Sequence, residues 1–222
     1  MPDPEAIHTA RDYWNRVAQE KNFTTPLPLE ALQQRLAPDA RILDYGCGYG
    51  RTLRVLRDAG FENGLGLDFS QRMIERGRAL WPDLRLEVCG PEGKGQTKLP
   101  LPDDEMDAVL LLAVLTCIRH DADQTALLAE LRRVLRPGGL LLVNDFLLAP
   151  DQRNQERYAR FAPDYGTFGV FEIPGGGVMR HHAPEHLRAL LRDFEILDWT
   201  EQTFTTMNGN HARGVTVLAN TV

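Results

Sequence analysis

The chain has 222 residues, of which 43% are hydrophobic and 25% are charged. This length and composition fit one α/β domain whose core is large enough to fold without a metal or disulfides. The formal net charge of −6 disfavours nucleic acid as a partner, because an acidic chain repels phosphate groups.

The cysteines and the apolar runs argue against a metal-binding, disulfide-rich, secreted or membrane protein. Cys47, Cys89 and Cys117 are far apart and form no CxxC pair, so we expect no metal site and no disulfide framework. A reducing, cytoplasmic location fits this pattern best. The first residues lack the basic start and apolar run of a signal peptide. The longest apolar run, 108–115, is too short to span a bilayer, so we expect no membrane partner.

In chain order, residues 5–36 predict two helices ahead of the first strand. Strand-like and helix-like segments then alternate. Strands buried on both faces of a parallel sheet are short and apolar without strict alternation. Five runs have this character: 41–44, 64–68, 84–88, 107–113 and 140–145. Amphipathic helices are predicted between them at 51–59, 70–80 and 123–135. This order predicts a doubly wound α/β sheet.

The last third of the chain departs from this alternation. Residues 150–180 combine prolines, glycines and aromatics, which indicates an insertion or lid. A helix is predicted at 183–191, with Pro184 in its first turn. Residues 194–206 and 215–220 predict two strands joined through the turn pair Asn208-Gly209. Two strands joined without a helix give an antiparallel edge on a parallel sheet.

The segment Asp44–Gly50 (DYGCGYG) ends a predicted strand and opens a predicted helix. Glycines at such a turn let the backbone approach a ligand closely. The spacing is G-x-G-x-G, and Arg51 stands where a dinucleotide fingerprint has its third glycine. Asp44 could meet a cationic ammonium, and Asp68, at the end of the next strand, could bind both hydroxyls of a ribose. The alternative is a tight structural turn without a ligand.

With these residues in place, the chain resembles the class I S-adenosylmethionine-dependent methyltransferases of the small-molecule type. Four segments carry the resemblance, in the order in which the family has them. They are the first motif at Asp44–Gly50, the ribose and adenine motif at Gly66–Ser70 with Met73, the segment Leu99–Val109 before the fourth strand, and the helix and turn Leu131–Gly139 before the fifth.

The resemblance implies a Rossmann-like, doubly wound sheet of seven strands, mostly parallel with an antiparallel last strand, and with helices on both faces. It also implies one methyltransferase domain over residues 1–222. We divide this domain into an N-terminal helical cap (1–37), a cofactor-binding core (38–148), an insertion or lid (149–182), and the last helix and strands (183–222).

The cofactor implied by the resemblance is S-adenosylmethionine. Asp44 would hold its amino group, the glycine turn its methionine part, and Asp68 its ribose. Phe69 and Met73 would flank adenine, although core packing explains these two equally well. After the third strand the chain departs from the family, and Glu92 or the backbone of Cys89 and Gly90 could contact adenine. The expected cofactor-binding residues are Asp44, Gly46, Cys47, Gly48, Gly50, Asp68, Phe69, Met73 and Ala113.

Methyl transfer from a sulfonium needs mainly desolvation and in-line orientation of the acceptor. A general base is useful only if the acceptor begins protonated. The candidates for a direct catalytic role are His181, His182 and Asp145, near the substrate-side ends of the late strands. The paired histidines could instead cap the following helix or lie in solvent. Arg180, next to them, could receive an anionic substrate.

The predicted function is therefore in-line methyl transfer from S-adenosylmethionine to a small-molecule acceptor. The alternatives are a methyltransferase of protein side chains and a non-catalytic module that binds S-adenosylmethionine. A nicotinamide-dependent oxidoreductase is disfavoured by Arg51. The acceptor atom is not specified by the sequence, because oxygen, nitrogen, sulfur and carbon acceptors are all served by this fold.

Overall fold

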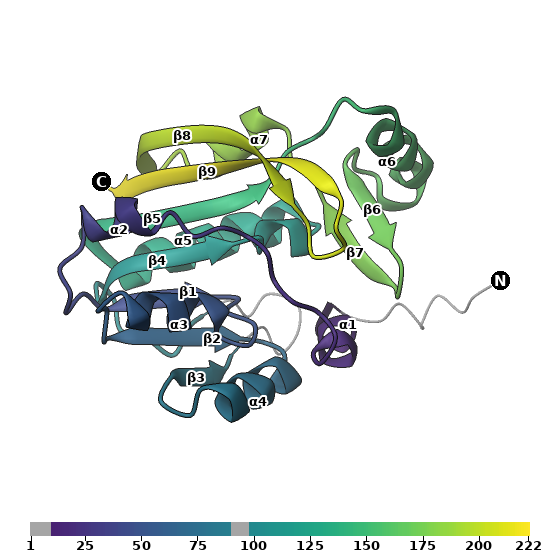
Figure 1. Ribbon diagram of the computed structural model, residues 1–222. Helices are drawn as coiled ribbons and strands as arrows, with labels where there is room; N and C mark the ends of the chain where they lie inside the picture. The colour runs from purple at the N-terminus through teal and green to yellow at the C-terminus, as the bar shows by residue number, and fades with distance from the viewer. Residues whose placement is uncertain (1–9, 90–97) are drawn as a thin grey trace.

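A seven-stranded sheet forms the centre of the protein (Figure 1). The computed structural model describes residues 10–89 and 98–222. The strand order is β3-β2-β1-β4-β5-β9-β8. The bounds are Ile42–Tyr45 (β1), Gly64–Asp68 (β2), Arg85–Val88 (β3), Met106–Leu112 (β4), Leu135–Phe146 (β5), Phe194–Thr205 (β8) and His211–Thr221 (β9). Strands β1 to β5 pair in parallel, and β9 runs antiparallel to both of its neighbours. The predicted sheet with its antiparallel last strand is confirmed.

Helices cover both faces of this sheet, as predicted. Helices α5 (Asp121–Val134) and α7 (Pro184–Leu190) pack on one face, together with Leu43 of β1 and Val109 of β4. Helix α3 (Arg51–Asp58), helix α4 (Gln71–Leu80) and the short α2 (Leu29–Gln33) pack on the other. Because β1 and β4 are covered on both faces, most of their residues are apolar, and the sequence shows no strict alternation there.

Several element boundaries differ from the prediction, and β9 begins at His211 rather than 215. Helix α5 begins at Asp121 rather than 123, with two aspartates in its first turn, where the helix dipole favours negative charge. Strand β5 begins at Leu135 and contains the Pro137-Gly138-Gly139 segment, where the sequence predicts a turn ahead of the strand. The register explains the difference, since Met106 pairs with Leu135 but Ala108 pairs with Leu140. The segment is therefore a bulge inside the strand, with Gly138 at a φ of +70°.

The segment between β5 and α7 contains a helix that is not expected from the sequence. Helix α6 (Gln152–Tyr165) is capped by Asp151, which accepts the backbone N–H of Asn154, and it ends at Gly166. A separate antiparallel pair follows, made of β6 (Val170–Ile173) and β7 (Gly177–Arg180).

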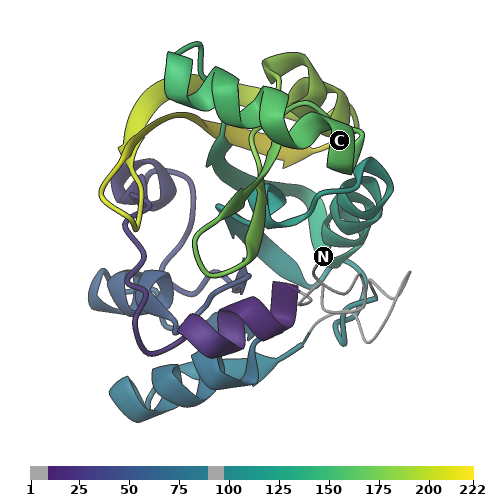
Figure 2. The same cartoon turned by 90° about the vertical axis from the view of Figure 1, so that its right-hand side faces the viewer.

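The insertion and the N-terminal segment meet at the same end of the sheet. Figures 1 and 2 place α6, the β6–β7 pair and α1 (Ala10–Val17) beside the carboxyl ends of the parallel strands. Residues 18–28, which we call the strap, run from α1 to α2. The strap reaches the turn between β8 and β9, because Thr24 Oγ1 donates to Thr205 O at 2.5 Å and Lys21 Nζ donates to Asn208 Oδ1 at 2.6 Å.

In the two stretches described, no helix combines the length and the apolar character needed to cross a membrane.

Candidate functional site

A cavity of about 510 Å³ lies at the carboxyl ends of β1, β2, β4 and β5. Its walls come from these strand ends, from the strap, from α6 with the β6–β7 pair, and from the turn between β8 and β9. In open α/β sheets, ligands bind in the crevice outside the carboxyl ends of the strands, at the point where the strand order reverses. Here β1 is that point, because β2 and β4 lie on its two sides.

Asp44, the residue before the tight turn at the end of β1, presents an unusual carboxylate. It is 2% exposed and lines the cavity, and its Oδ2 has no hydrogen-bond partner among the residues that the structure describes. Burial raises the pKa of Asp44 to about 7, Asp68 adds to the increase, and Arg51 opposes it. A buried carboxylate oxygen without a partner is costly unless a cation or a hydrogen-bond donor reaches it from the cavity.

Asp68, at the end of β2, joins the glycine turn to helix α4. Its Oδ2 accepts the Gly48 N–H at 2.8 Å, and its Oδ1 accepts the Ser70 N–H at 2.7 Å. Ser70 in turn caps α4, since its Oγ accepts the N–H of Met73. Burial raises the pKa of Asp68 to about 6, against the lowering effect of the two backbone hydrogen bonds. Each carboxylate oxygen can accept further hydrogen bonds from the cavity.

The glycines of the turn have different roles. Gly46 and Cys47 line the cavity, and their N–H groups both donate to Leu67 O. Gly48 and Gly50 do not line it, and they shape the turn instead. All three glycines have positive φ, at +73°, +55° and +81° in chain order. Gly48 lies under the ring of Phe23 from the strap, and Gly50 caps helix α3.

Substituting Gly48 with alanine is expected to destabilise the fold and displace the strap. The new Cβ would lie 2.1 Å from Phe23 Cε2, in addition to the strain of an alanine at φ +55°. Gly138→Ala is the matched control, because Gly138 has φ +70° and no atom within 4 Å of the added Cβ. We expect the control to lose about 1–2 kcal/mol in urea unfolding, and Gly48→Ala to lose more. Equal losses in the two variants would contradict the packing described here.

The three remaining predicted cofactor residues, Phe69, Met73 and Ala113, all line the cavity. Met73 is also buried in a small cluster with Ala18 and Tyr49, so it belongs to the core as well. Ala113 has a φ of +56°, and its N–H donates to Asn144 O at 2.6 Å. Strained backbone of this kind concentrates at ligand sites. Of the possible adenine contacts after β3, Gly90 and Glu92 lie outside the described residues.

Of the three predicted catalytic residues, only His181 lines the cavity in the described part of the chain. Its ring stacks on Phe146, with the centroids 5.4 Å apart, and its Nδ1 is 2.7 Å from Tyr158 Oη. Burial lowers the pKa of His181 well below 6.5, and the charge of Arg157 lowers it further. His181 is therefore neutral at physiological pH.

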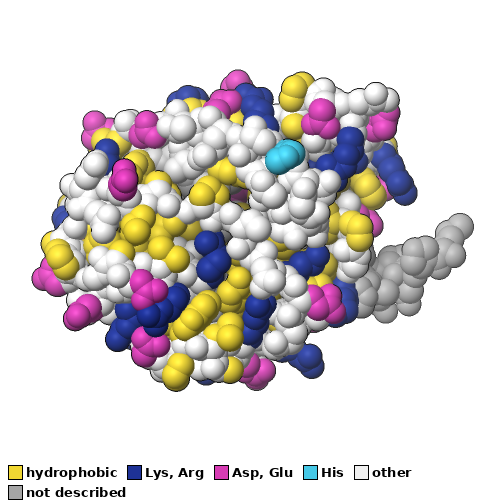
Figure 3. All heavy atoms as spheres, viewed as in Figure 1, with side chains coloured by type: hydrophobic (Ala, Val, Ile, Leu, Met, Phe, Trp, Pro, Cys, Tyr) yellow, Lys and Arg dark blue, Asp and Glu magenta, His cyan; other side chains and the backbone are white. Residues whose placement is uncertain are grey.

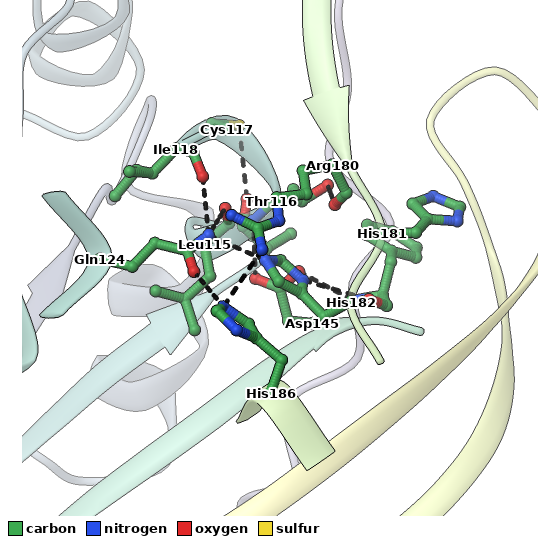
Figure 4. Close-up of polar contacts among 12 residues, drawn as sticks. Leu115, Thr116, Cys117, Ile118, Gln124, Asp145, Arg180, His181, His182 and His186 are labelled. Carbon is green, nitrogen blue, oxygen red and sulfur yellow. Dashed lines mark hydrogen bonds and ion pairs between the residues drawn. The ribbon is translucent and has the colours of Figure 1, made fainter. Parts of the chain in front are cut away.

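His182 and Asp145 lie in a buried polar cluster (Figure 4) and do not line the cavity. Asp145 accepts the N–H groups of Phe146 and Thr116 at 2.8 and 3.1 Å, and His182 Nδ1 is 3.6 Å from its Oδ1. Burial raises the pKa of Asp145 to about 7 and lowers the pKa of His182 to about 3. On the other side, His182 Nε2 is 2.9 Å from Gln124 Nε2. This cluster fixes the backbone that follows β4 and β5.

Arg180 does not line the cavity either. It pairs with Asp121 at 2.5 Å and donates to Arg119 O at 2.8 Å, so its charge is used within the fold. Two other arginines, Arg153 and Arg157 of α6, do line the cavity. Neither is among the site residues predicted from the sequence, because α6 itself is not predicted.

Comparison with known proteins identifies a domain in part of the chain. The family model of the methyltransferase domain matches residues 43–143. A 27-O-demethylrifamycin SV methyltransferase of Amycolatopsis mediterranei (strain S699) is 34% identical, over 60% of this chain and 48% of that protein. A demethylmenaquinone methyltransferase of Beutenbergia cavernae is 37% identical, over 63% of this chain and 51% of that protein. The chain spans about half the length of these two curated relatives.

The fold also has a solved counterpart. The crystal structure of an S-adenosylmethionine-dependent methyltransferase from Methanosarcina mazei superposes with a TM-score of 0.81, at 22% identity, over 89% of this chain and 99% of that one. The four ordered motifs, the seven-stranded sheet and the domain match agree. Residues 43–143 are therefore a methyltransferase domain, and the chain has the fold of an S-adenosylmethionine-dependent methyltransferase.

Proposed function

We propose that this protein transfers a methyl group from S-adenosylmethionine to a small-molecule acceptor. The observation that carries the proposal is the Asp44 carboxylate, which is buried at the cavity and whose Oδ2 has no partner within residues 10–89 and 98–222. A cationic amino group supplies the partner that this oxygen lacks, and a pyrophosphate does not.

The other residues around the turn fit the rest of the cofactor. Asp68 lines the cavity next along the sheet, with acceptor capacity left for the two ribose hydroxyls. Phe69 and Met73 offer apolar surface for adenine. The cavity of about 510 Å³ lies within the range of about 300–1,000 Å³ that is usual for small-molecule sites.

When bound, S-adenosylmethionine supplies an activated methyl group on a sulfonium. The protein's own task is to orient the acceptor and to exclude water. Proximity and orientation together can supply about 7–11 kcal/mol of the barrier in favourable cases. The strap contributes to exclusion, because it is held to the turn between β8 and β9 by Thr24 and Lys21, and to the glycine turn by the hydrogen bond from the Phe23 N–H to Tyr49 Oη.

Among the three predicted catalytic residues, we assign direct contact with the acceptor to His181. It is the one whose side chain lines the cavity, and as a neutral imidazole it can hydrogen-bond the acceptor, while its lowered pKa disfavours a role as a general base. His182 and Asp145 would act through the backbone that they hold. His181 would therefore contact the acceptor, and the buried cluster of His182 and Asp145 would hold the surrounding backbone in place.

The small-molecule acceptor is supported by the size of the cavity and by the surface charge. Acidic and basic side chains are interspersed on the face shown in Figure 3, without one extended basic stripe. With a net charge of −6, this surface does not favour nucleic acid.

Mass spectrometry of reactions with S-adenosylmethionine and a panel of small molecules tests the proposal. We expect one class of compound to gain a single methyl group while S-adenosylhomocysteine accumulates. The Asp68→Ala variant, assayed at the same cofactor concentration, serves as the control and should react more slowly. Binding of S-adenosylhomocysteine without methylation of any small molecule or protein would instead indicate a non-catalytic binding module.

The affinity for S-adenosylhomocysteine is expected to rise with pH between about 5 and 8. The amino group of the ligand is cationic over this range and favours the charged form of Asp44, whose folded pKa is about 7. Asp68, with a pKa of about 6, acts in the same direction. Calorimetric titrations at several pH values measure this pH dependence of the affinity. In Asp44→Asn, the change in affinity around pH 7 should disappear. A wild-type affinity independent of pH would contradict the placement of the amino group.

A further inference from the structure

One wall of the cavity carries positive charge that the proposed cofactor site does not use. Arg153 and Arg157 lie one turn apart on α6, and both line the cavity. Figure 2 shows α6 at the top of the view and α4, the helix that contains Met73, at the bottom, so the two helices lie on opposite sides of the protein. The acceptor side of the cavity therefore includes two guanidinium groups.

The Arg157 guanidinium is held in place but is not neutralised. Its Cζ lies 3.5 Å from the centroid of the Phe171 ring, and its Nε is buried without a hydrogen-bond partner in the described part of the chain. Its polar neighbours are the Tyr158 hydroxyl and His181 Nε2, the latter at 3.5 Å from Nη2. The carboxylate of Asp151 acts on it through its charge without forming an ion pair. Within residues 10–89 and 98–222, neither Arg157 nor Arg153 forms an ion pair with an aspartate or glutamate.

Glu172 is the acidic residue that lines the cavity on the same side, and it does not neutralise these arginines. Its Oε1 accepts the Tyr165 hydroxyl at 2.8 Å. A partly buried guanidinium without an anionic partner carries a desolvation cost. Stacking on Phe171 offsets part of that cost, and the contact with His181 Nε2 is long at 3.5 Å, so the N–H edge of the guanidinium can still donate to an anion in the cavity. This edge matches the two oxygens of a carboxylate or a phosphate.

We propose that Arg157, assisted by Arg153, binds an anionic group of the methyl acceptor, so that the acceptor is a small carboxylate or phosphate compound. Phe146 and Phe171, which also line the cavity, would pack against its apolar part. The proposal rests on the proposed function, because it assigns the wall to the acceptor and not to the methyl donor.

Calorimetry on the wild-type protein saturated with S-adenosylhomocysteine tests the proposal with three aromatic probes. Benzoate and phenyl phosphate carry the two anionic groups, and benzamide is the neutral analogue. We expect at least one anionic probe to bind about 10-fold or more tightly than benzamide, as one charged hydrogen-bonded contact implies. The better of the two anions identifies the preferred group. Equal binding of all three probes would overturn the proposal.

Variants locate the effect. Arg157→Gln should weaken binding of the preferred anion about 10-fold, while the affinity for S-adenosylhomocysteine stays within about 2-fold of the wild-type value. Arg157→Lys keeps the charge without the forked donor and should recover part of the loss. Arg160→Gln is the matched control, because Arg160 is on the same helix, lies over Phe161 and does not line the cavity.

The two proposals fail in different ways. An equal loss of S-adenosylhomocysteine and anion affinity in Arg157→Gln would place Arg157 at the donor and overturn this inference, while the proposed function stands. Failure of the wild-type protein to bind S-adenosylhomocysteine would overturn the proposed function itself. Retained binding of S-adenosylhomocysteine by Arg157→Gln also shows that the variant is folded.

Discussion

Replacing Asp68 with alanine is expected to weaken S-adenosylhomocysteine binding about 10- to 150-fold, equivalent to about 1.5–3 kcal/mol. The variant loses the carboxylate proposed to accept the ribose hydroxyls. It also loses the acceptors for the N–H groups of Gly48 and Ser70, which hold the glycine turn against the start of α4. Both losses act on the same ligand, so a large effect follows.

Calorimetry with two ligands tests this prediction. S-adenosylhomocysteine carries both halves of the cofactor, whereas 5′-methylthioadenosine has the nucleoside but no amino acid part. We expect Asp68→Ala to weaken the binding of both ligands to a similar extent, since both contain the ribose. Unchanged affinity for 5′-methylthioadenosine would show that Asp68 does not contact the ribose.

Replacing Asp44 with asparagine is expected to weaken ligand binding and to raise the stability of the free protein. S-adenosylhomocysteine should bind about 10- to 150-fold more weakly at pH 8, because a neutral amide replaces the carboxylate proposed to pair with the amino group. 5′-Methylthioadenosine should bind as it does to the wild type. Without ligand, the variant should melt at a higher temperature, because the new amide side chain carries no buried charge.

The pH dependence of this stabilisation follows from the raised pKa of Asp44. Its folded value of about 7 lies above the unfolded value of 3.8, so the folded state holds the proton more tightly than the unfolded state. Wild-type stability therefore falls as pH rises from about 4 to 7, and the full cost is present above pH 7. Asp44→Asn should raise the melting temperature more at pH 8 than at pH 5. A lower melting temperature at both pH values would contradict the account of Asp44.

The sheet and its helices could be predicted from sequence because their signals are local. The runs that form β1, β4 and β5 are apolar at successive positions, as strands covered by helices on both sides require. Helix α6 gives no such signal. Its buried side chains are Asn154 and Tyr158, and Pro163 lies inside it. Without an apolar stripe, the helix cannot be told from the glycine- and proline-rich segment that follows.

In the candidate site, too, some residues could be predicted from the sequence and others could not. Asp44 and Asp68 could be placed because each ends a strand, and the carboxyl ends of neighbouring parallel strands meet at one edge. His181 and His182 are adjacent in sequence, but successive residues of extended chain face opposite sides. One ring therefore reaches the cavity while the other enters the cluster with Asp145. The sequence alone does not say which ring faces which way, because that depends on the pairing of His182 with Leu147, beyond the ends of β7 and β5.

Calorimetric titration of the wild-type protein with S-adenosylhomocysteine, and in parallel with NAD, tests the central claim most directly. That claim is that the turn Asp44–Gly50 and Asp68 bind the methyl donor. We predict that S-adenosylhomocysteine binds at one site per chain and that NAD gives no binding heat. Binding of NAD without binding of S-adenosylhomocysteine would contradict the claim.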